Sequence, residues 1–167
     1  MNKLLTLTAL LFTCVFAFGQ NYPETAGFVK NGEEKEYHYN GQLSAIGIYV
    51  KGAKEGKWTY YDEQGKLKKT GNYTNDKTAG EWKFYDKDGN LSDILNYENG
   101  LSESYYTNGK LKSKGKNVTS VEKYYKTGTF ETYNEFTSEL ETLESFKKGK
   151  PIGEYIIYGR NGDLKEI

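Results

Sequence analysis

The residues of this chain that could do acid–base or metal chemistry begin with two close pairs of carboxylates. Asp62 adjoins Glu63, and Asp86 lies two residues before Asp88. Paired carboxylates can act as general acid and base, or can hold calcium. Each pair, however, lies beside a glycine-containing turn, where an aspartate usually accepts hydrogen bonds from its own backbone. The pattern favours a turn role, with a calcium site as the alternative.

The only histidine is His38, which occupies the slot that Asp62 and Asp86 occupy in later segments, and the only cysteine is Cys14. A zinc site needs several His or Cys ligands, and a catalytic triad needs a nucleophile beside its base. The chain also lacks the Gly-x-Ser-x-Gly, phosphate-loop and His-Glu-x-x-His motifs. From the sequence we therefore expect that the chain is not an enzyme and that it has no catalytic residue, no metal site and no cofactor site.

A repeat of 24 residues organises the first half of the chain. Nearly the same twelve residues occur as GKWTYYDEQGKL from Gly56 and as GEWKFYDKDGNL from Gly80. The step then shortens, because Gly89 is followed by Gly109 and that by Gly128, which indicates units that have lost part of a loop or strand. The motif returns near the C terminus. We count roughly six units.

Each unit has the pattern of a β-hairpin. Segments such as KWTYYD and LKKTGNY alternate apolar and polar residues, and the Asn-Gly or Asp-Gly turns supply the positive φ that tight turns require. The 16 tyrosines also favour strands. One hairpin cannot bury its own aromatic face, so neighbours must shelter one another. We expect an all-β fold, an elongated meandering antiparallel sheet of roughly six tandem hairpins.

Aromatic residues at this spacing can form either the core or an exposed ladder. Pleating places Trp58 and Tyr60 on one face and Tyr61 on the other. We expect tryptophan to stack on tryptophan and leucine on leucine in successive units. The candidate partner-binding surface is Tyr61, Tyr85 and Tyr37, whose phenols can be half-buried and still offer a hydroxyl. The expected structural core consists of Trp58, Trp82, Leu43, Leu67, Leu91, Tyr49, Tyr73 and Tyr97.

The spacing Tyr60-Tyr61-x-x-x-Gly65-Lys66-Leu67, followed by Gly71-x-Tyr73 and Gly80-x-Trp82, resembles the bacterial variant of the MORN repeat (membrane occupation and recognition nexus). Proteins built from it are often labelled YwqK-type antitoxins. The resemblance covers roughly Tyr37 to Ile167, although the Gly-x-Trp element is absent between Ser104 and Leu143. It implies a meandering sheet of hairpins used as a scaffold or binding surface, with no shared catalytic residues.

The N-terminal segment has the layout of a secretory signal. Residues 1–19 contain one early cation and an apolar run that ends in Ala17-Phe18-Gly19, so we expect cleavage before Gln20 and a periplasmic or secreted chain. Lipid anchoring through Cys14 is the alternative, which the apolar residues after it disfavour. We expect residues 20–34 to form a tail and a capping strand, and residues 35–167 to form the repeat domain.

The balance of charge excludes some classes of partner. The chain has 23 basic and 23 acidic residues and a formal net charge of zero. Without a basic excess or an amphipathic helix, neither nucleic acid nor a membrane surface is expected as a partner. Loss of Cys14 with the signal would leave no disulfide.

The sequence thus predicts an exported, non-catalytic repeat scaffold that binds another macromolecule, first of all a protein. Two alternatives remain open. Aromatic stripes with many Asn, Thr and Asp residues also suit a polysaccharide-binding module, and the family resemblance suggests an antitoxin or immunity protein that neutralises a toxin. An open sheet could also pair with a second copy, so a homodimer stays open too.

Overall fold

A computed structural model describes residues 29–119, 124–159 and 162–166 of the chain. Within these ranges there are thirteen strands and no helix, and so none that could span a membrane. The strands are β1 (Gly32–Tyr37), β2 (Leu43–Val50), β3 (Ala53–Tyr61), β4 (Leu67–Thr74), β5 (Lys77–Tyr85), β6 (Leu91–Asn96), β7 (Leu101–Tyr105), β8 (Leu111–Thr119), β9 (Tyr124–Tyr133), β10 (Leu140–Lys147), β11 (Lys150–Pro151), β12 (Ile156–Tyr158) and β13 (Leu164–Glu166).

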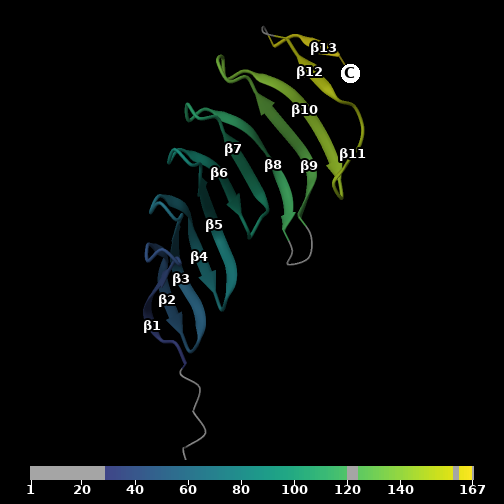
Figure 1. The fold of residues 1–167 in the computed structure, drawn as a ribbon. Helices are drawn as coiled ribbons and strands as arrows, with labels where there is room; N and C mark the ends of the chain where they lie inside the picture. The colour runs from purple at the N-terminus through teal and green to yellow at the C-terminus, as the bar shows by residue number, and fades with distance from the viewer. Residues whose placement is uncertain (1–28, 120–123, 160–161, 167) are drawn as a thin grey trace, which may run out of the picture.

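The strands form one open antiparallel sheet in which each strand from β1 to β9 pairs with the next along the chain. The order runs from β1 to β10 and then to β12 and β13, while the short β11 pairs with β10. The sheet is elongated and curves along its length (Figure 1). The predicted all-β meander of tandem hairpins is confirmed. The signal segment 1–19, with cleavage before Gln20, lies outside the described residues. β1 begins at Gly32 and crosses the boundary expected at residue 35.

The turn aspartates bond to their own backbone, as the turn interpretation predicts. Asp62 Oδ1 accepts from the N–H groups of Gln64 and Lys66 at 3.0 and 2.8 Å. Asp86 Oδ1 accepts from the corresponding N–H groups at 2.8 and 2.9 Å. The glycine that closes the second of these turns, Gly89, has a φ of +90°, a conformation that glycine adopts without strain. These side chains therefore hold the hairpin turns.

Replacing Asp86 with asparagine should lower the melting temperature at pH 7, and the difference from the wild type should shrink as the solution is acidified. Hydrogen bonds, first from the Asn90 backbone N–H, lower the pKa of Asp86. A carboxyl with a lowered folded pKa stabilises the chain above its ordinary pKa of about 4, and this contribution is lost as the pH falls through the folded value. Thermal unfolding at neutral and acidic pH measures the effect. Asp88→Asn is the control, since its side chain makes none of these bonds; an equal pH-dependent loss there would contradict the assignment.

The middle of the chain departs from the expected spacing at Gly128. This residue lies inside β9, where Gly56 lies in β3, and the two have φ values of +70° and +65°. The turn of this unit is formed by residues 134–139, in which Ser138 takes the positive φ of 64°. Interpreting Gly128 as the next turn glycine was therefore wrong. Each repeat holds two positive-φ glycines, and here the turn glycine is missing.

The two tryptophans lie flat against glycines of the preceding strand. A Cβ on Gly47 would lie 2.2 Å from the Trp58 ring, and one on Gly71 would lie 2.2 Å from the Trp82 ring. Neither glycine has a positive φ, so what the position requires is space. Each indole N–H donates to the carbonyl of the residue after that glycine, at 3.2 and 3.0 Å. The tryptophans are 0% and 1% exposed, although the sheet is a single layer.

Tyrosine rings lie between the tryptophans and complete the core. The Tyr73 ring centroid is 6.2 Å from that of Trp58 and 5.0 Å from that of Trp82, with both pairs nearly perpendicular. Tyr60 contacts the same two indoles at 6.0 and 6.1 Å. The structure thus corrects the expected stacking of tryptophan on tryptophan. Equivalent strands of successive hairpins are about 10 Å apart, too far for their indoles to touch, and tyrosine fills the gap.

Lysine side chains cover this aromatic row from solvent. Lys54 Nζ lies 3.9 Å from the Trp58 ring centroid, and Lys69 Nζ lies 4.6 Å from that of Tyr60. Burial lowers the pKa of Lys69 and raises that of Tyr60. The aliphatic stems shield the rings while the ammonium groups make cation–π contacts. We call the side of the sheet that carries Trp58 and Trp82 the tryptophan face.

Candidate binding surfaces

A row of tyrosine–leucine pairs marks the turn end of every hairpin. Each pair joins the last residue of one strand to the first residue of the next, and each adjoins an irregularity in the register. Register defines six such pairs along the sheet, which we call the tyrosine–leucine row: Tyr37–Leu43, Tyr61–Leu67, Tyr85–Leu91, Tyr105–Leu111, Tyr133–Leu140 and Tyr158–Leu164.

The candidate tyrosines of the sequence analysis belong to this row. Tyr61 and Tyr85 are half-buried, whereas Tyr37 at the first unit is 60% exposed. At the other end, Leu164 is 53% exposed. Terminal members lack a neighbouring hairpin on one side, which accounts for their exposure.

The leucines that were expected in the core are not fully buried. Leu43, Leu67 and Leu91 are half-buried, because each packs against the tyrosine of its own hairpin in the row and not beneath the indoles. Of the expected core residues only the two tryptophans are fully buried, and the repeated tyrosines are half-buried. These tyrosines are Tyr49, Tyr73 and Tyr97. Ala45 and Phe130 complete the buried apolar set of the described residues.

Two middle pairs of the tyrosine–leucine row, Tyr105–Leu111 and Tyr133–Leu140, were not identified from the sequence. A signal was present, since Tyr105 precedes Leu111 by six residues, as Tyr61 precedes Leu67. In the fifth hairpin the longer turn adds one residue to this spacing and hides it.

Polar side chains surround the row on the face opposite the tryptophans. Tyr105 donates to Glu103 Oε2 at 2.5 Å, and Tyr133 donates to Glu131. Burial, followed by the hydrogen bond to Glu103, raises the pKa of Tyr105 to about 12, so the phenol stays protonated at neutral pH. Residues two apart in a strand share a face, so these carboxylates and tyrosines lie on one side. We call it the tyrosine–leucine face.

One polar row crosses this face from strand to strand. Its central members pair directly: Thr59 with Thr70, Thr70 with Lys83, Lys83 with Ile94 and Ile94 with Glu103. The two threonine hydroxyls lie 3.3 Å apart. Two threonines, one lysine and one glutamate therefore share this row with Ile94 beside the tyrosines. Such a surface stays hydrated yet offers many hydrogen-bonding groups.

On the tryptophan face, the aromatic row is interrupted at the fourth hairpin. Register places Ser102 in the slot of Trp58 and Trp82, and Leu95 in the slot of the glycine beneath the indole. Asn117 stands in the slot of the repeated tyrosine. The row resumes in β9, where Phe130 takes the tryptophan position against Gly115 and contacts Phe146 at 5.6 Å.

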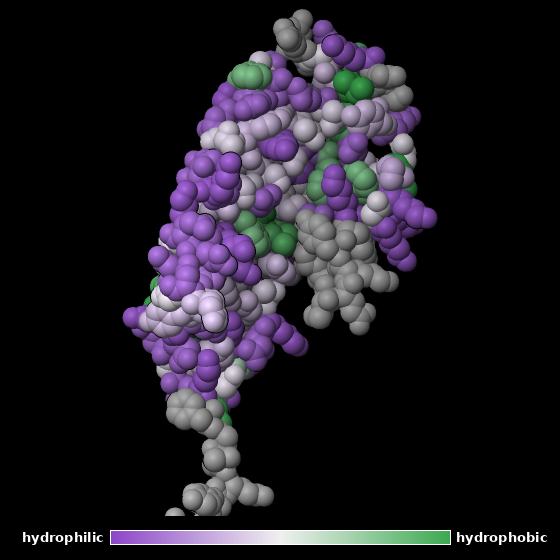
Figure 2. Space-filling view, in the orientation of Figure 1, coloured by the Kyte–Doolittle hydropathy of each residue, from purple (hydrophilic) through white to green (hydrophobic). Residues whose placement is uncertain are grey.

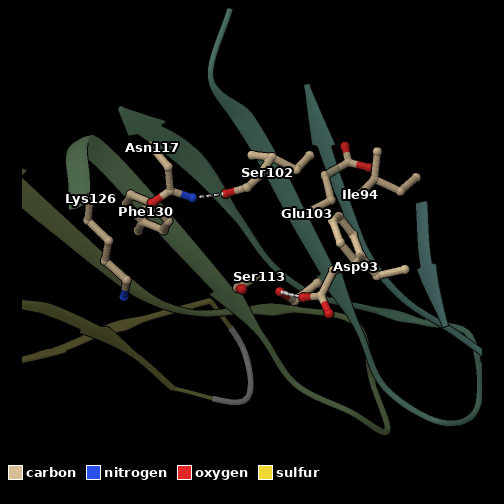
Figure 3. A pocket seen from close by; sticks show the side chains of 11 residues that line it. Asp93, Ile94, Ser102, Glu103, Ser113, Asn117, Lys126 and Phe130 are labelled. Carbon is tan, nitrogen blue, oxygen red and sulfur yellow. Dashed lines mark hydrogen bonds between the residues drawn. The ribbon is translucent and has the colours of Figure 1, made fainter. Parts of the chain in front are cut away.

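A pocket of about 360 Å³ occupies the interruption, and Asn117 and Phe130 are among the residues that line it (Figure 3). Phe84 of β5 also belongs to the lining. Its polar lining includes Asp93, Ser104 and Asn117. From the sequence, the Gly-x-Trp element was expected to be absent only between Ser104 and Leu143, so the change at Ser102 and the pocket beside it were not predicted. The substituting residues, small and polar, form no motif.

The side chains that could do chemistry lie at turns. His38 Nε2 is 3.0 Å from the Tyr61 carbonyl oxygen, a contact between one turn and the next hairpin. Asp62 and Asp86 hold their own turns, as described above. In the part of the chain that the structure covers, no group of three His, Cys, Asp or Glu side chains is placed to bind a metal ion.

Comparison with protein families agrees with this geometry. The MORN repeat variant model matches residues 30–51, 54–75, 79–99 and 98–116, and these segments coincide with the first four hairpins, β1–β2 to β7–β8. No curated protein matches the chain. MORN repeats are non-catalytic modules that generally bind proteins or membranes. With four such repeats in register with four hairpins, the chain belongs to the MORN repeat variant family.

Proposed function

We propose that this chain is an exported scaffold whose tyrosine–leucine face binds a partner protein. The observation that carries the proposal is the recurrence of a half-buried tyrosine in the same place on successive hairpins. Tyrosine gives a large contact area, loses little conformational entropy on binding and keeps a hydroxyl for hydrogen bonds. Export rests on the signal layout of residues 1–19.

The spacing of the row supports an extended partner that crosses several hairpins. Equivalent residues of neighbouring hairpins lie two strands apart, about 10 Å. At the N-terminal end the same face carries Ile48 and Val50, which are 47% and 44% exposed. Exposed apolar residues beside a tyrosine row suit a protein interface with an apolar centre, and the charged residues of the polar row would supply selectivity at its rim.

The double substitution Tyr61→Ala with Tyr85→Ala should reduce partner capture about tenfold or more, since buried tyrosines often dominate binding energy. The wild-type chain is cross-linked in the envelope fraction, and the captured proteins are compared between variants by mass spectrometry. The same fraction should contain a chain that begins at Gln20, which tests export.

Tyr97→Ala is the matched control, because it removes a half-buried tyrosine from the tryptophan face. This variant should retain capture. Undiminished capture by the double variant would exclude the tyrosine–leucine face as the site, and recovery of no partner by the wild type would reject the proposal as a whole.

A further inference from the structure

We propose that the pocket on the tryptophan face binds a sugar unit of a glycan. This site lies on the side of the sheet opposite the tyrosine–leucine face and does not depend on the proposed protein partner. The pocket volume, about 360 Å³, falls within the range of small-ligand sites, about 300–1,000 Å³. It suits one small ligand unit.

The pocket exists because two aromatic slots of the repeat hold serines. Ser102 replaces the tryptophan, and Ser104 stands where Tyr60 and Phe84 stand in the preceding units. In the earlier units an indole packs against a glycine at this place. Here Leu95 replaces the glycine, and its side chain fills only part of the volume that the absent indole would occupy. These substitutions leave a space at this one place along the sheet, and serine hydroxyl groups line it.

A buried hydrogen-bond acceptor in this space has no partner. Asn117 is 3% exposed, and its Nδ2 donates to Ser102 Oγ at 2.5 Å (Figure 3). Among the described residues, its Oδ1 has no hydrogen-bond donor. Leaving a buried polar atom unpaired is costly, and most such atoms in proteins are bonded. This oxygen is itself covered in the structure, so a ligand hydroxyl would donate to it after a shift of the Asn117 side chain.

The rest of the polar lining offers both acceptors and donors. Asp93 accepts from Ser104 Oγ at 2.6 Å, and Ser104 pairs across the strands with Ser113. The Lys126 ammonium lies 4.7 Å from the Phe130 ring centroid, at the other side of the pocket. Charges of both signs with several hydroxyls fit a neutral ligand that both donates and accepts, better than an anion or a cation.

Aromatic walls complete the match to a sugar. Phe84 in β5 and Phe130 in β9 come from the two outermost strands that line the pocket, and Leu95 adds apolar surface. The C–H groups on the face of a pyranose ring pack against the negative face of an aromatic ring, while the hydroxyls at its edge reach polar groups. Figure 2 shows apolar side chains gathered toward the inner side of the curved sheet, on a surface that is otherwise mostly hydrophilic.

The test is an NMR titration of the isotope-labelled chain with maltotriose, cellotriose and chitotriose, each at millimolar concentration. We expect saturable shifts at the Asn117 side-chain amide and at the backbone amide of Ser102 with at least one trisaccharide. The indole N–H signal of Trp58 is the internal control and should not move. Asp93→Asn should weaken binding about tenfold, because a carboxylate accepts stronger hydrogen bonds than an amide, whereas the turn variant Asp88→Asn should bind normally.

A second variant, Leu95→Gly with Ser102→Trp, fills the pocket with the indole of the repeat and should abolish binding. Shifts that persist in this filled variant, or the absence of shifts with all three sugars, would overturn the proposal. Saturable shifts with indole or N-acetyltyrosine amide and none with the sugars would also overturn it, since the pocket would then accept an aromatic side chain. Tyr61→Ala should leave sugar binding unchanged, which separates this outcome from that of the protein-binding test.

Discussion

Gly71→Ala is expected to lower the free energy of unfolding by about 3 kcal/mol, at the upper end of the usual cost of overpacking a core. The added Cβ would lie 2.2 Å from the Trp82 ring, and the indole has no room to retreat because Tyr73 and Tyr97 contact it from the two neighbouring strands' sides. Urea denaturation followed by circular dichroism measures the loss. The prediction rests on close approach alone, since Gly71 has no positive φ.

Gly89→Ala separates this steric effect from the ordinary cost of replacing a glycine. Gly89 has a φ of +90° and no atom within 4 Å of the added Cβ. Its replacement should cost about 1 kcal/mol through backbone strain alone. An equal or greater loss at Gly89 would contradict the view that indoles pack directly on the strand backbone.

The chain itself contains a compensated version of this site. Where the third and fourth hairpins meet, the glycine slot in β6 holds Leu95 and the tryptophan slot in β7 holds Ser102. A Gly71→Leu variant should therefore regain part of its lost stability when Trp82→Ser is added. If adding Trp82→Ser restored no stability, a smaller residue in the tryptophan slot would not make room for a larger one in the glycine slot, which would contradict this prediction.

Trp82→Ala should lower the free energy of unfolding by about 4 kcal/mol, a large share of the stability of a single domain. Trp82 is 1% exposed and contacts three tyrosine rings at 5.0, 6.1 and 6.3 Å. Its removal leaves a cavity and also breaks the contact between two neighbouring hairpins. Because the stability of a repeat array depends on such contacts, the loss should extend beyond one unit. The fluorescence of Trp58 reports unfolding of the adjacent unit.

Phe130→Ala is the matched comparison for this prediction. Phe130 occupies the same slot and is 6% exposed, but among the described residues it has one aromatic neighbour, Phe146, at 5.6 Å. Its replacement should cost less than that of Trp82. The reverse order would show that the continuous aromatic row does not carry the stability of the sheet.

The two proposed sites divide the two faces of the sheet between different ligands. The tyrosine–leucine row repeats at every hairpin, so it offers an extended partner several equivalent contacts. The pocket occurs once, at the place where the repeat is broken, so it offers one site of defined shape. A regular array can bind through repetition, but a site for a single small unit needs a departure from the repeat.

Local patterns in the sequence predicted the secondary structure well. Alternation of apolar and polar residues and the Gly-containing turns are properties of a few consecutive residues, so they identify hairpins without knowledge of the fold. The 24-residue step identified Trp58 and Trp82 as equivalent positions, and the structure finds both against a glycine of the preceding strand. The spacing of Tyr61 to Leu67 contained the pairing of the tyrosine–leucine row as well.

Other features depend on which residues face each other across strands. Gly71 and Gly65 are both repeated glycines, yet one makes room for an indole and the other closes a turn with a φ of +79°. Tyrosine lies between the tryptophans because successive hairpins are too far apart for indoles to meet.

The sequence by itself determined the all-β class, the hairpins and their repetition, because these follow from strand periodicity and turn chemistry within each unit. The tertiary structure alone decided what the repeated residues contact and where the row breaks. It brought Ser102 and Asn117, fifteen residues apart in the chain, to within hydrogen-bonding distance and left a pocket between Phe84 and Phe130. The physical reason is register: bulges and loop lengths set it across the whole sheet, and one residue of shift sends a side chain to the other face.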